Sequence, residues 1–126
     1  MYGEGDLNWD RIIPGTIRSL LAGETPRIRS NGKLVRDYFY VQDAVSAYIA
    51  LMDAEGAFNF GSGEPVSVLD LVLKIERLMG KPEMDYIIEN RAKGEIDQQY
   101  LDWEKARVEL GWSPEFSLDT GLERTI

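Results

Sequence analysis

In three segments, residues 13–21, 41–52 and 68–79, apolar residues recur every three or four positions, and these segments constrain the fold of this chain most strongly. The clearest segment follows Ser67, which is expected to cap a helix, and ends at Gly80, which suits a helix stop. One face of that helix would carry the apolar residues Val68, Leu71, Val72, Ile75, Leu78 and Met79. The segment is therefore predicted to be an amphipathic helix with one buried face.

The other two periodic segments, together with cap, turn and alternation signals, place the remaining helices and strands along the chain. We expect further helices at residues 11–22 (with Asp10 as N-cap), 41–52, 103–110 (after Asp102) and from Ser117 onward. Short strands are predicted at residues 26–30, 34–40, 57–60 and 84–89. Helices that alternate with short strands indicate the α/β class, and 126 residues fit one domain spanning residues 1–126.

The composition excludes several classes of function. The formal net charge of −8 argues against general binding of nucleic acid or anionic membrane surfaces. The chain has no cysteine and no histidine, so it has no disulfide framework and lacks the commonest general base and metal ligand. Because no apolar run approaches the length of a membrane span and no signal pattern opens the chain, we expect a cytoplasmic protein.

The sequence contains no complete motif for catalysis or dinucleotide binding. A dinucleotide fingerprint places glycines at G-x-G-x-x-G between a strand and a helix, so that backbone approaches a pyrophosphate. The stretch GSGEPVSVL at 61–69 lacks the third glycine, and a loop that leads into Ser67 is favoured over a phosphate cradle. No metal-ligand spacing and no nucleophilic serine elbow is present, so the residues alone indicate no reaction.

Four basic residues gather within ten positions of this otherwise acidic chain: Arg27, Arg29, Lys33 and Arg36. Alternation along a strand would place Arg27 and Arg29 on one side, and the guanidinium fork suits bidentate contact with phosphate. The competing interpretation is a charged surface strand in which Arg36 forms a structural pair with Asp37 or Asp43. Composition alone leaves both interpretations open.

Three stretches, taken in succession, resemble one family of proteins. They are YGEGDLNWDRIIPGTIRSLLAGETPRIRSNGKLVRDYFYVQDAVSAY, FNFGSGEPVSVLDLV and IDQQYLDWEKARVELGWSP, and together they cover essentially the whole chain. They resemble the C-terminal, substrate-binding part of the NAD-dependent epimerase/dehydratase family of extended short-chain dehydrogenase/reductases. Within that family the sequence of these stretches is most similar to that of CDP-glucose 4,6-dehydratases.

The resemblance implies a Rossmann domain that holds NAD and a smaller domain that holds the nucleotide sugar. This chain is similar to the smaller one, so we expect a nucleotide-sugar-binding domain fragment of about five helices with short strands. The Rossmann N-terminal half is expected to be absent, and the chain to stop within the last helix of the family. None of the six tyrosines has lysine four positions later, so the Tyr-x-x-x-Lys pair of the family is missing. We therefore expect no catalytic residue, no cofactor bound by this chain alone and no independent activity.

The resemblance also implies residues that contact the diphosphate of the ligand. Arg36, in VRDY, matches the arginine that pairs with the diphosphate in the family, with Asp37 shaping the turn. Arg91 is assigned to a second diphosphate contact, although it stands one position earlier than the family arginine. Asp43 is interpreted as a helix cap. Glu4 replaces the proline of the usual YGPGD turn and loosens it.

Five further positions match the nucleoside side of the family's pocket. Arg11 and Ile12 line the nucleotide near the start of the first helix, where backbone N–H groups favour anions. Ile28 and Arg29 match the place that holds the base, and Arg29 could stack on the base through its guanidinium. Val68 matches a position near the base or ribose.

Three functions remain open at this point. The first is a nucleotide-sugar-binding part of a dehydratase or epimerase, inactive alone. The second is a non-catalytic oligomerising or partner-binding module derived from that family. The third is an enzyme half completed by a separate Rossmann-domain partner. In the family, residues 41–52 and 57–60 are understood to pack on the Rossmann sheet, so we expect exposed apolar surface here and self-association into a homo-oligomer.

Overall fold

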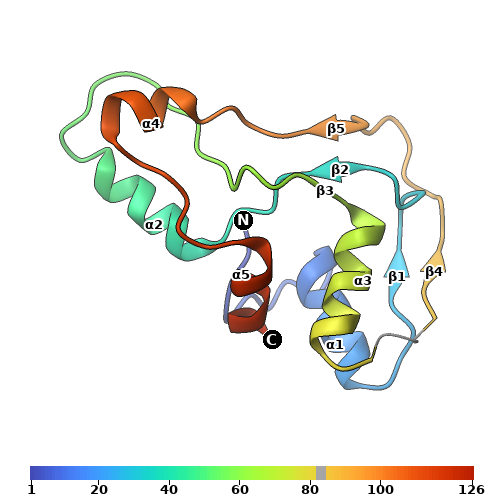
Figure 1. The fold of residues 1–126 in the computed structure, drawn as a ribbon. Helices are drawn as coiled ribbons and strands as arrows, with labels where there is room; N and C mark the ends of the chain where they lie inside the picture. The colour runs from blue at the N-terminus through green and yellow to red at the C-terminus, as the bar shows by residue number, and fades with distance from the viewer. Residues whose placement is uncertain (82–84) are drawn as a thin grey trace.

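The computed structural model describes residues 1–81 and 85–126, and five helices and five short strands lie within them (Figure 1). The helices are α1 (Ile12–Leu21), α2 (Val41–Ala50), α3 (Val68–Leu78), α4 (Glu104–Leu110) and α5 (Leu118–Thr125). The strands are β1 (Arg27–Ile28), β2 (Val35–Arg36), β3 (Val66–Ser67), β4 (Ile87–Ile88) and β5 (Gln98–Gln99). The predicted α/β class with about five helices and short strands is confirmed.

The strands form two small sheets. β1 pairs in parallel with β4, so that Arg27 lies opposite Ile87 and Ile28 opposite Ile88. β2 lies between β3, which is antiparallel to it, and β5, which is parallel to it. In Figure 1, β1 and β4 lie at one end of the molecule, and α2 and α4 lie at the other.

The strand predictions were only partly right. The strands predicted at 26–30, 34–40 and 84–89 are observed as β1, β2 and β4, each only two residues long. Met84 lies outside the described residues. The strand predicted at 57–60 is wrong for this chain. That segment is not hydrogen-bonded into either sheet of the described residues, and Phe58 and Phe60 pack instead against an aromatic cluster. β5 was not predicted, because Gln98 and Gln99 have no strand-like apolar pattern.

The main hydrophobic core lies between α1, α3 and α5. Its buried residues come from all three helices and from the aromatic segments around Tyr2 and Tyr40: Tyr2, Ile13, Ile17, Leu20, Tyr40, Leu71, Ile75, Leu118 and Leu122. The helix faces predicted for α1 and α3 supply most of them, which confirms that their apolar periodicity indicates burial. This core holds α1 against α3 and thereby fixes the side of the molecule on which the arginines lie.

A second, aromatic cluster joins α2 to α4. Ala47, Ala106 and Trp112 are buried there. The Trp112 ring meets those of Phe60 and Trp103 edge to face, with ring centroids 4.8 and 5.8 Å away, an arrangement that suits the ring quadrupoles. The Trp112 indole N–H donates to Ser46 Oγ at 2.9 Å, so its polar atom is satisfied.

Two of the predicted helix caps were wrong. The N-cap of α1 is Arg11, and no side chain caps the helix; the Asp10 carboxylate bonds Arg29 instead. Asp43 lies in the first turn of α2, buried, and its carboxylate accepts the N–H groups of Glu115 at 2.8 Å and Phe116 at 3.3 Å. Asp43 therefore ties α2 to the segment before α5 and does not cap α2.

Of two other predicted caps, Ser67 is right and Asp102 lies one position before the observed N-cap residue. Ser67 Oγ accepts the N–H of Asp70 at 3.1 Å, so the N-cap of α3 is confirmed. The Asp102 carboxylate accepts the N–H of Glu104 at 2.9 Å one position before the N-cap residue, Trp103. These two serine- and aspartate-type contacts satisfy N–H groups that the first helical turn leaves unpaired.

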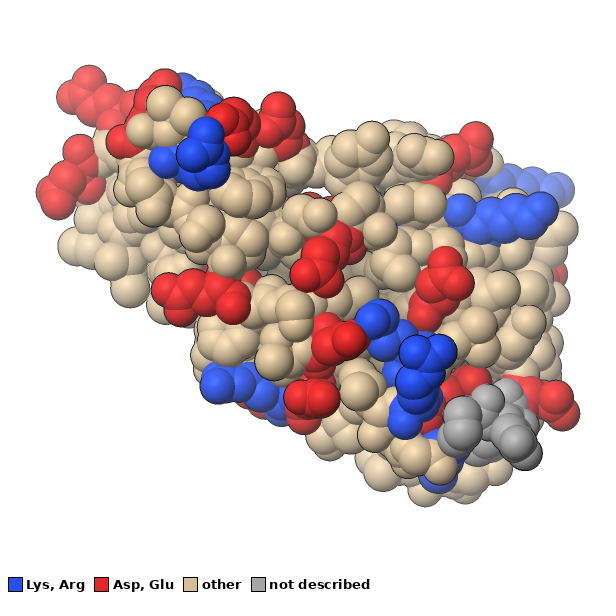
Figure 2. All heavy atoms as spheres, viewed as in Figure 1, with Lys and Arg blue, Asp and Glu red and all other residues tan. Residues whose placement is uncertain are grey.

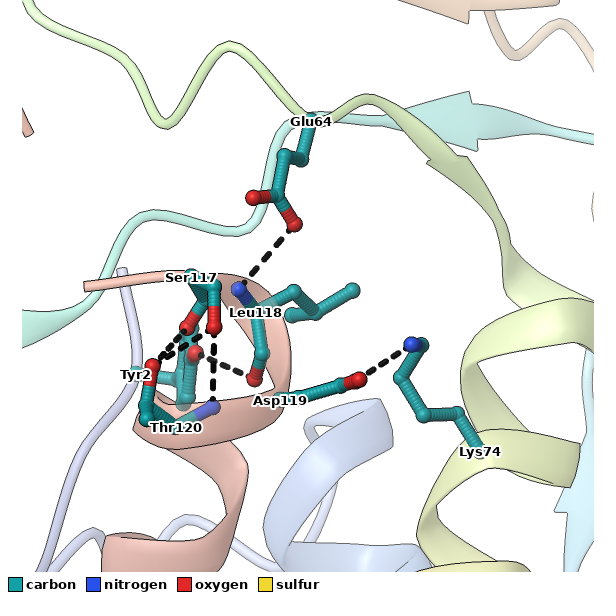
Figure 3. A network of polar contacts seen from close by, with 7 residues as sticks. All are labelled: Tyr2, Glu64, Lys74, Ser117, Leu118, Asp119 and Thr120. Atoms are coloured by element: carbon teal, nitrogen blue, oxygen red, sulfur yellow. Dashed lines mark hydrogen bonds and ion pairs between the residues drawn. The ribbon is translucent and has the colours of Figure 1, made fainter.

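The start of α5 is held from three directions, as Figure 3 shows. Ser117 Oγ accepts the N–H of Thr120, and the Glu64 carboxylate accepts the N–H of Leu118 at 3.1 Å. Lys74 of α3 pairs with Asp119. A carboxylate at a helix N-terminus is also favoured by the helix dipole, so Glu64 stabilises α5 electrostatically as well.

The charged side chains of the molecule are mixed in sign. On the face drawn in Figure 2, acidic groups outnumber basic ones, and basic groups lie beside them without forming a continuous patch. Among the helices of the described residues, none combines the length and the apolar character that crossing a membrane requires.

We predict that Gly121→Ala destabilises the protein by about 1–3 kcal/mol, because overpacking strains a close-packed core. A Cβ at Gly121 would contact the buried Tyr2 hydroxyl, which donates to the Leu118 carbonyl. Urea unfolding of Gly121→Ala, Tyr2→Phe and the double variant measures this. Removal of the hydroxyl should recover part of the loss in the double variant, and strictly additive effects would contradict the contact.

Glu76 of α3 is the one side chain whose burial lacks a matching contact in the described residues. It is 1% exposed, and neither carboxylate oxygen has a hydrogen-bond partner there. Burial first, and then the nearby charge of Asp85, raises the pKa of Glu76 above its ordinary value. An ionised carboxylate in such a position costs stability.

We predict that Glu76→Met raises the melting temperature at pH 7.5 by about 3 °C or more. Since the folded-state pKa is raised, the protonated form favours folding, and wild-type stability falls as pH rises above the unfolded-state pKa near 4.5. The gap between Glu76→Met and wild type should therefore widen from pH 5 to pH 8. Glu109→Met, at an exposed position on α4, is the control, and a gap that stays constant with pH would contradict the prediction.

Candidate functional site

A cavity of about 430 Å³ lies beside the first turn of α1, bounded by β1, β2 and the segment after β4. Its lining is rich in arginine and hydroxyl groups. The residues are Trp9, Asp10, Arg11, Ile12, Gly15, Thr16, Ser19, Arg27, Arg29, Ser30, Leu34, Arg36, Tyr38, Val68, Glu89, Arg91 and Glu95. The cavity is thus built from segments that are far apart in the sequence.

Six of the seven predicted site residues line this one cavity: Arg11, Ile12, Arg29, Arg36, Val68 and Arg91. The seventh, Ile28 of β1, is fully buried and is not part of the lining. The alternation predicted for β1 is confirmed, because Arg27 and Arg29 are exposed on either side of buried Ile28. Any ligand contact of Ile28 would be limited to its backbone.

Arg36 is the most constrained of these arginines. Its Nη1 group donates to the backbone carbonyls of Val35 and Ile96, both at 2.8 Å, and Nη2 donates to Glu95 at 3.0 Å. The Arg36 side chain is 22% exposed and Glu95 is 49% exposed. The structural pairs considered from the sequence, Arg36 with Asp37 or Asp43, are both wrong; the partner is Glu95, which sequence spacing did not indicate.

Asp37 has a different task. Its carboxylate accepts hydrogen bonds from the N–H and the hydroxyl of Ser62. The Ser62 hydroxyl in turn accepts the N–H of Glu64 at 3.0 Å. The stretch at 61–69 is therefore a loop that leads into the Ser67 cap, as the sequence favoured, and the amides of Ser62 and Glu64 are already bonded.

The remaining arginines of the cavity are also paired with carboxylates. Arg29 bonds Asp10 at 2.8 Å, and Arg11 bonds Asp6 at 3.1 Å. Glu89 accepts from both Arg27, at 3.1 Å, and Arg91. The hydrogen bonds from Arg91 and Arg27 hold the pKa of Glu89 below its ordinary value.

The lining carries an excess of positive charge in a chain with net charge −8. It includes five arginines against three carboxylates, Asp10, Glu89 and Glu95, an excess of two positive charges. Tyr38, also in the lining, is largely buried, and burial raises its pKa to about 12, so its hydroxyl remains a neutral hydrogen-bond group at physiological pH. Arginine side chains gathered in this way suit a dianionic ligand such as a diphosphate.

A second cavity of about 310 Å³ adjoins the first at Arg36, which lines both. The other residues of this cavity are Met1, Asp37, Phe39, Phe60, Gln99, Tyr100 and Leu101. Arg36 is thus the residue that the two cavities share.

The sequence pattern did not indicate the acidic residues of the site. Glu89 and Glu95 reach it from the segment after β4, and nothing in the local sequence joins them to the arginines of residues 27–36. Within the described residues, no group of three His, Cys, Asp or Glu side chains is arranged to hold a metal ion. The arrangement can bind an anion, and we assign no catalytic residue to it.

Comparison with known proteins identifies the family. The family model for GDP-mannose 4,6 dehydratase matches residues 8–125. The UDP-glucose 4-epimerase of Bifidobacterium longum is 38% identical over 71% of this chain and 27% of its own length. The low-salt glycan biosynthesis protein Agl12 of Haloferax volcanii is 34% identical over 93% of this chain and 38% of its own length. The chain thus spans well under half the length of these relatives.

Solved structures agree with the sequence relatives. The UDP-glucose 4-epimerase of Thermotoga maritima, solved with UDP-glucose, is 32% identical and has a TM-score of 0.84 over 91% of this chain and 38% of its own. An epimerase of Methanothermobacter thermautotrophicus gives a TM-score of 0.88 at 27% identity over 98% of this chain and 39% of its own. This chain belongs to the NAD-dependent epimerase/dehydratase family of extended short-chain dehydrogenase/reductases and corresponds to the C-terminal part of its members.

Proposed function

We propose that this chain forms the nucleotide-diphosphate-sugar binding part of an NAD-dependent epimerase or dehydratase and is inactive alone. The observation that carries the proposal is the arginine-lined cavity around Arg36. It concentrates positive charge in a chain that is strongly acidic overall. The excess of two positive charges suits the two negative charges of a diphosphate diester.

The hydrogen bonds of Arg36 support a role in diphosphate binding. The two carbonyl bonds from Nη1 fix the guanidinium plane, so little side-chain entropy remains to be lost when a ligand binds. Nη2 and Nε are then the donors for phosphate oxygens. Glu95, which is half exposed, is the group that a diphosphate would displace from Nη2.

The two adjoining cavities suit the two ends of such a ligand. With the diphosphate at Arg36, we place the nucleoside along α1 and β1 in the larger cavity and the sugar in the smaller one. Two of the four relatives named above are UDP-glucose 4-epimerases. The sequence of this chain also resembles that of CDP-glucose 4,6-dehydratases. UDP-glucose and CDP-glucose are therefore the ligands to test.

The described residues do not fit NAD itself. NAD supplies hydride transfer in this family, and its pyrophosphate needs free backbone amides in a glycine turn. The loop most similar to such a turn is the stretch at 61–69. There the Ser62 N–H already donates to the Asp37 carboxylate, and the Glu64 N–H donates to the Ser62 hydroxyl. We propose that NAD binding and catalysis require a Rossmann domain that these 126 residues do not supply.

We predict that Arg36→Ala weakens the binding of CDP-glucose or UDP-glucose about 10- to 100-fold, because a charge-assisted hydrogen bond to phosphate is lost. Isothermal titration calorimetry of both sugar nucleotides measures this. Arg107→Ala removes an arginine of α4 that is paired with Glu104 and lines none of the cavities described above, so it is the matched control. An unchanged dissociation constant in Arg36→Ala, with binding intact, would exclude the proposed diphosphate site.

A second candidate function is a partner-binding or self-associating module. It is favoured by the apolar side chains exposed on the outer face of α2 and in the turn after it: Val45, Tyr48, Ile49 and Met52. Met52 is exposed to 78%. A cavity of about 340 Å³, lined mainly by apolar and aromatic side chains that include Phe58 and Phe60, continues this face. An exposed apolar surface of this kind commonly marks a protein–protein contact, here with a Rossmann domain or with a second copy of the chain.

If the second candidate is right, sedimentation velocity should show concentration-dependent dimers of the isolated chain, and Ile49→Asp should shift them to monomers. A charge in the middle of an apolar interface leaves an unpaired buried ion on association, which explains the expected loss. Val108→Asp changes an equally exposed apolar residue on α4 and should have no effect. A monomer at every concentration would contradict self-association.

A further inference from the structure

Glu89 lies at the centre of a cluster of charged side chains at the β1–β4 end of the larger cavity. One carboxylate oxygen accepts from Arg27 at 3.1 Å, and the other accepts from Arg91. The Glu89 side chain is only 12% exposed, whereas Arg27 and Arg91 are 64% and 71% exposed. The arginines thus shield a carboxylate that remains part of the cavity lining.

The register of the sheet places this cluster beside Arg29. β1 and β4 are parallel, with Arg27 opposite Ile87 and Ile28 opposite Ile88, so Arg29 follows opposite Glu89. The backbone continues the pairing, since the Glu89 N–H bonds the Ile28 carbonyl and the Arg91 N–H bonds the Arg29 carbonyl. The face of β1 that carries Arg27 and Arg29 therefore presents guanidinium groups together with the carboxylates of Glu89 and Asp10.

Resting on the proposed function, we propose that Glu89 sets the nucleobase preference of the cavity by selecting a base with an exocyclic amino group. Guanidinium planes stack on nucleobases, so the Arg27–Arg29–Arg91 surface suits a base. A carboxylate accepts from the N4 amino group of cytosine but opposes the O4 oxygen of uracil. CDP-linked ligands are therefore preferred over UDP-linked ones.

Glu89 retains the capacity for this contact. A carboxylate offers about four lone-pair sites. Arg27 occupies one site on Oε1, and the Nε and Nη2 groups of Arg91 occupy two on Oε2, so one site on Oε1 remains for a base. The other two carboxylates of the lining are less suitable. Asp10 is 84% exposed, so solvent screens its charge, and Glu95 is bonded to Arg36, which we assign to the diphosphate.

Titration of CDP and UDP into the wild-type chain and into Glu89→Gln tests the proposal. The two nucleotides share ribose and diphosphate, so the ratio of their dissociation constants isolates the base. The wild type should bind CDP about tenfold or more tightly than UDP. Glu89→Gln should bring the ratio to within about twofold, since the amide can accept from N4 and also donate to O4. Glu104→Gln, which breaks the exposed pair with Arg107, should leave the ratio unchanged.

The outcomes separate this inference from the proposed function. Loss of the CDP preference in Glu89→Gln, with UDP binding kept or improved, supports the inference. Equal binding of both nucleotides by the wild type, or an equal loss of both in Glu89→Gln with a lower melting temperature, overturns it and makes Glu89 a structural link between β1 and β4. If the wild type binds neither nucleotide, the proposed function fails and the inference fails with it.

Discussion

The hydrogen bonds that fix the Arg36 guanidinium orient the positive charge on which the proposed ligand binding depends. Val35 belongs to β2, Ile96 lies just before β5, and their carbonyls converge on one nitrogen of Arg36. A half-buried cation with two fixed carbonyl partners still requires an anion, and Glu95 satisfies it in this structure. The three-stranded sheet, although short, thereby places a pre-oriented arginine where two cavities meet.

The hydrophobic core supplies the rigid support for that position. α1 packs on α3 through Ile13, Ile17 and Leu20, and the same helix offers Arg11 and Ile12 to the cavity from its first turn. α5 closes the other side of the core, with its first turn held by Glu64, Ser117 and Lys74. Stability and ligand geometry therefore rest on the same helices.

Much of this fold could be predicted from local patterns. The apolar period of α3 and its Ser67 cap determine both the extent of the helix and its buried face. The side of β1 on which Arg27 and Arg29 lie followed from alternation alone. Six site residues assigned through family resemblance lie around one cavity.

Other features depend on contacts that the sequence does not display. Glu95 and Glu89 lie about 60 residues from the arginines they bond, with separations of 59 and 62 positions for the Arg36 and Arg27 pairs. Asp10 suits a helix cap by its type, but the opposite charge of Arg29 draws its carboxylate to the cavity. The apolar period of α2 by itself predicts burial, but Val45 and Ile49 are exposed because nothing in the described residues covers them. Only the family resemblance led us to expect this exposure.

The central claim is that a diphosphate takes the place of Glu95 on Arg36. A crystal structure of the chain with CDP-glucose tests this most directly. We expect phosphate oxygens within hydrogen-bond distance of Arg36 Nη2 or Nε, in place of the Glu95 carboxylate. The hydrogen bonds from Arg36 Nη1 to the Val35 and Ile96 carbonyls should remain. A bound sugar nucleotide that leaves the Arg36–Glu95 pair intact would contradict the account.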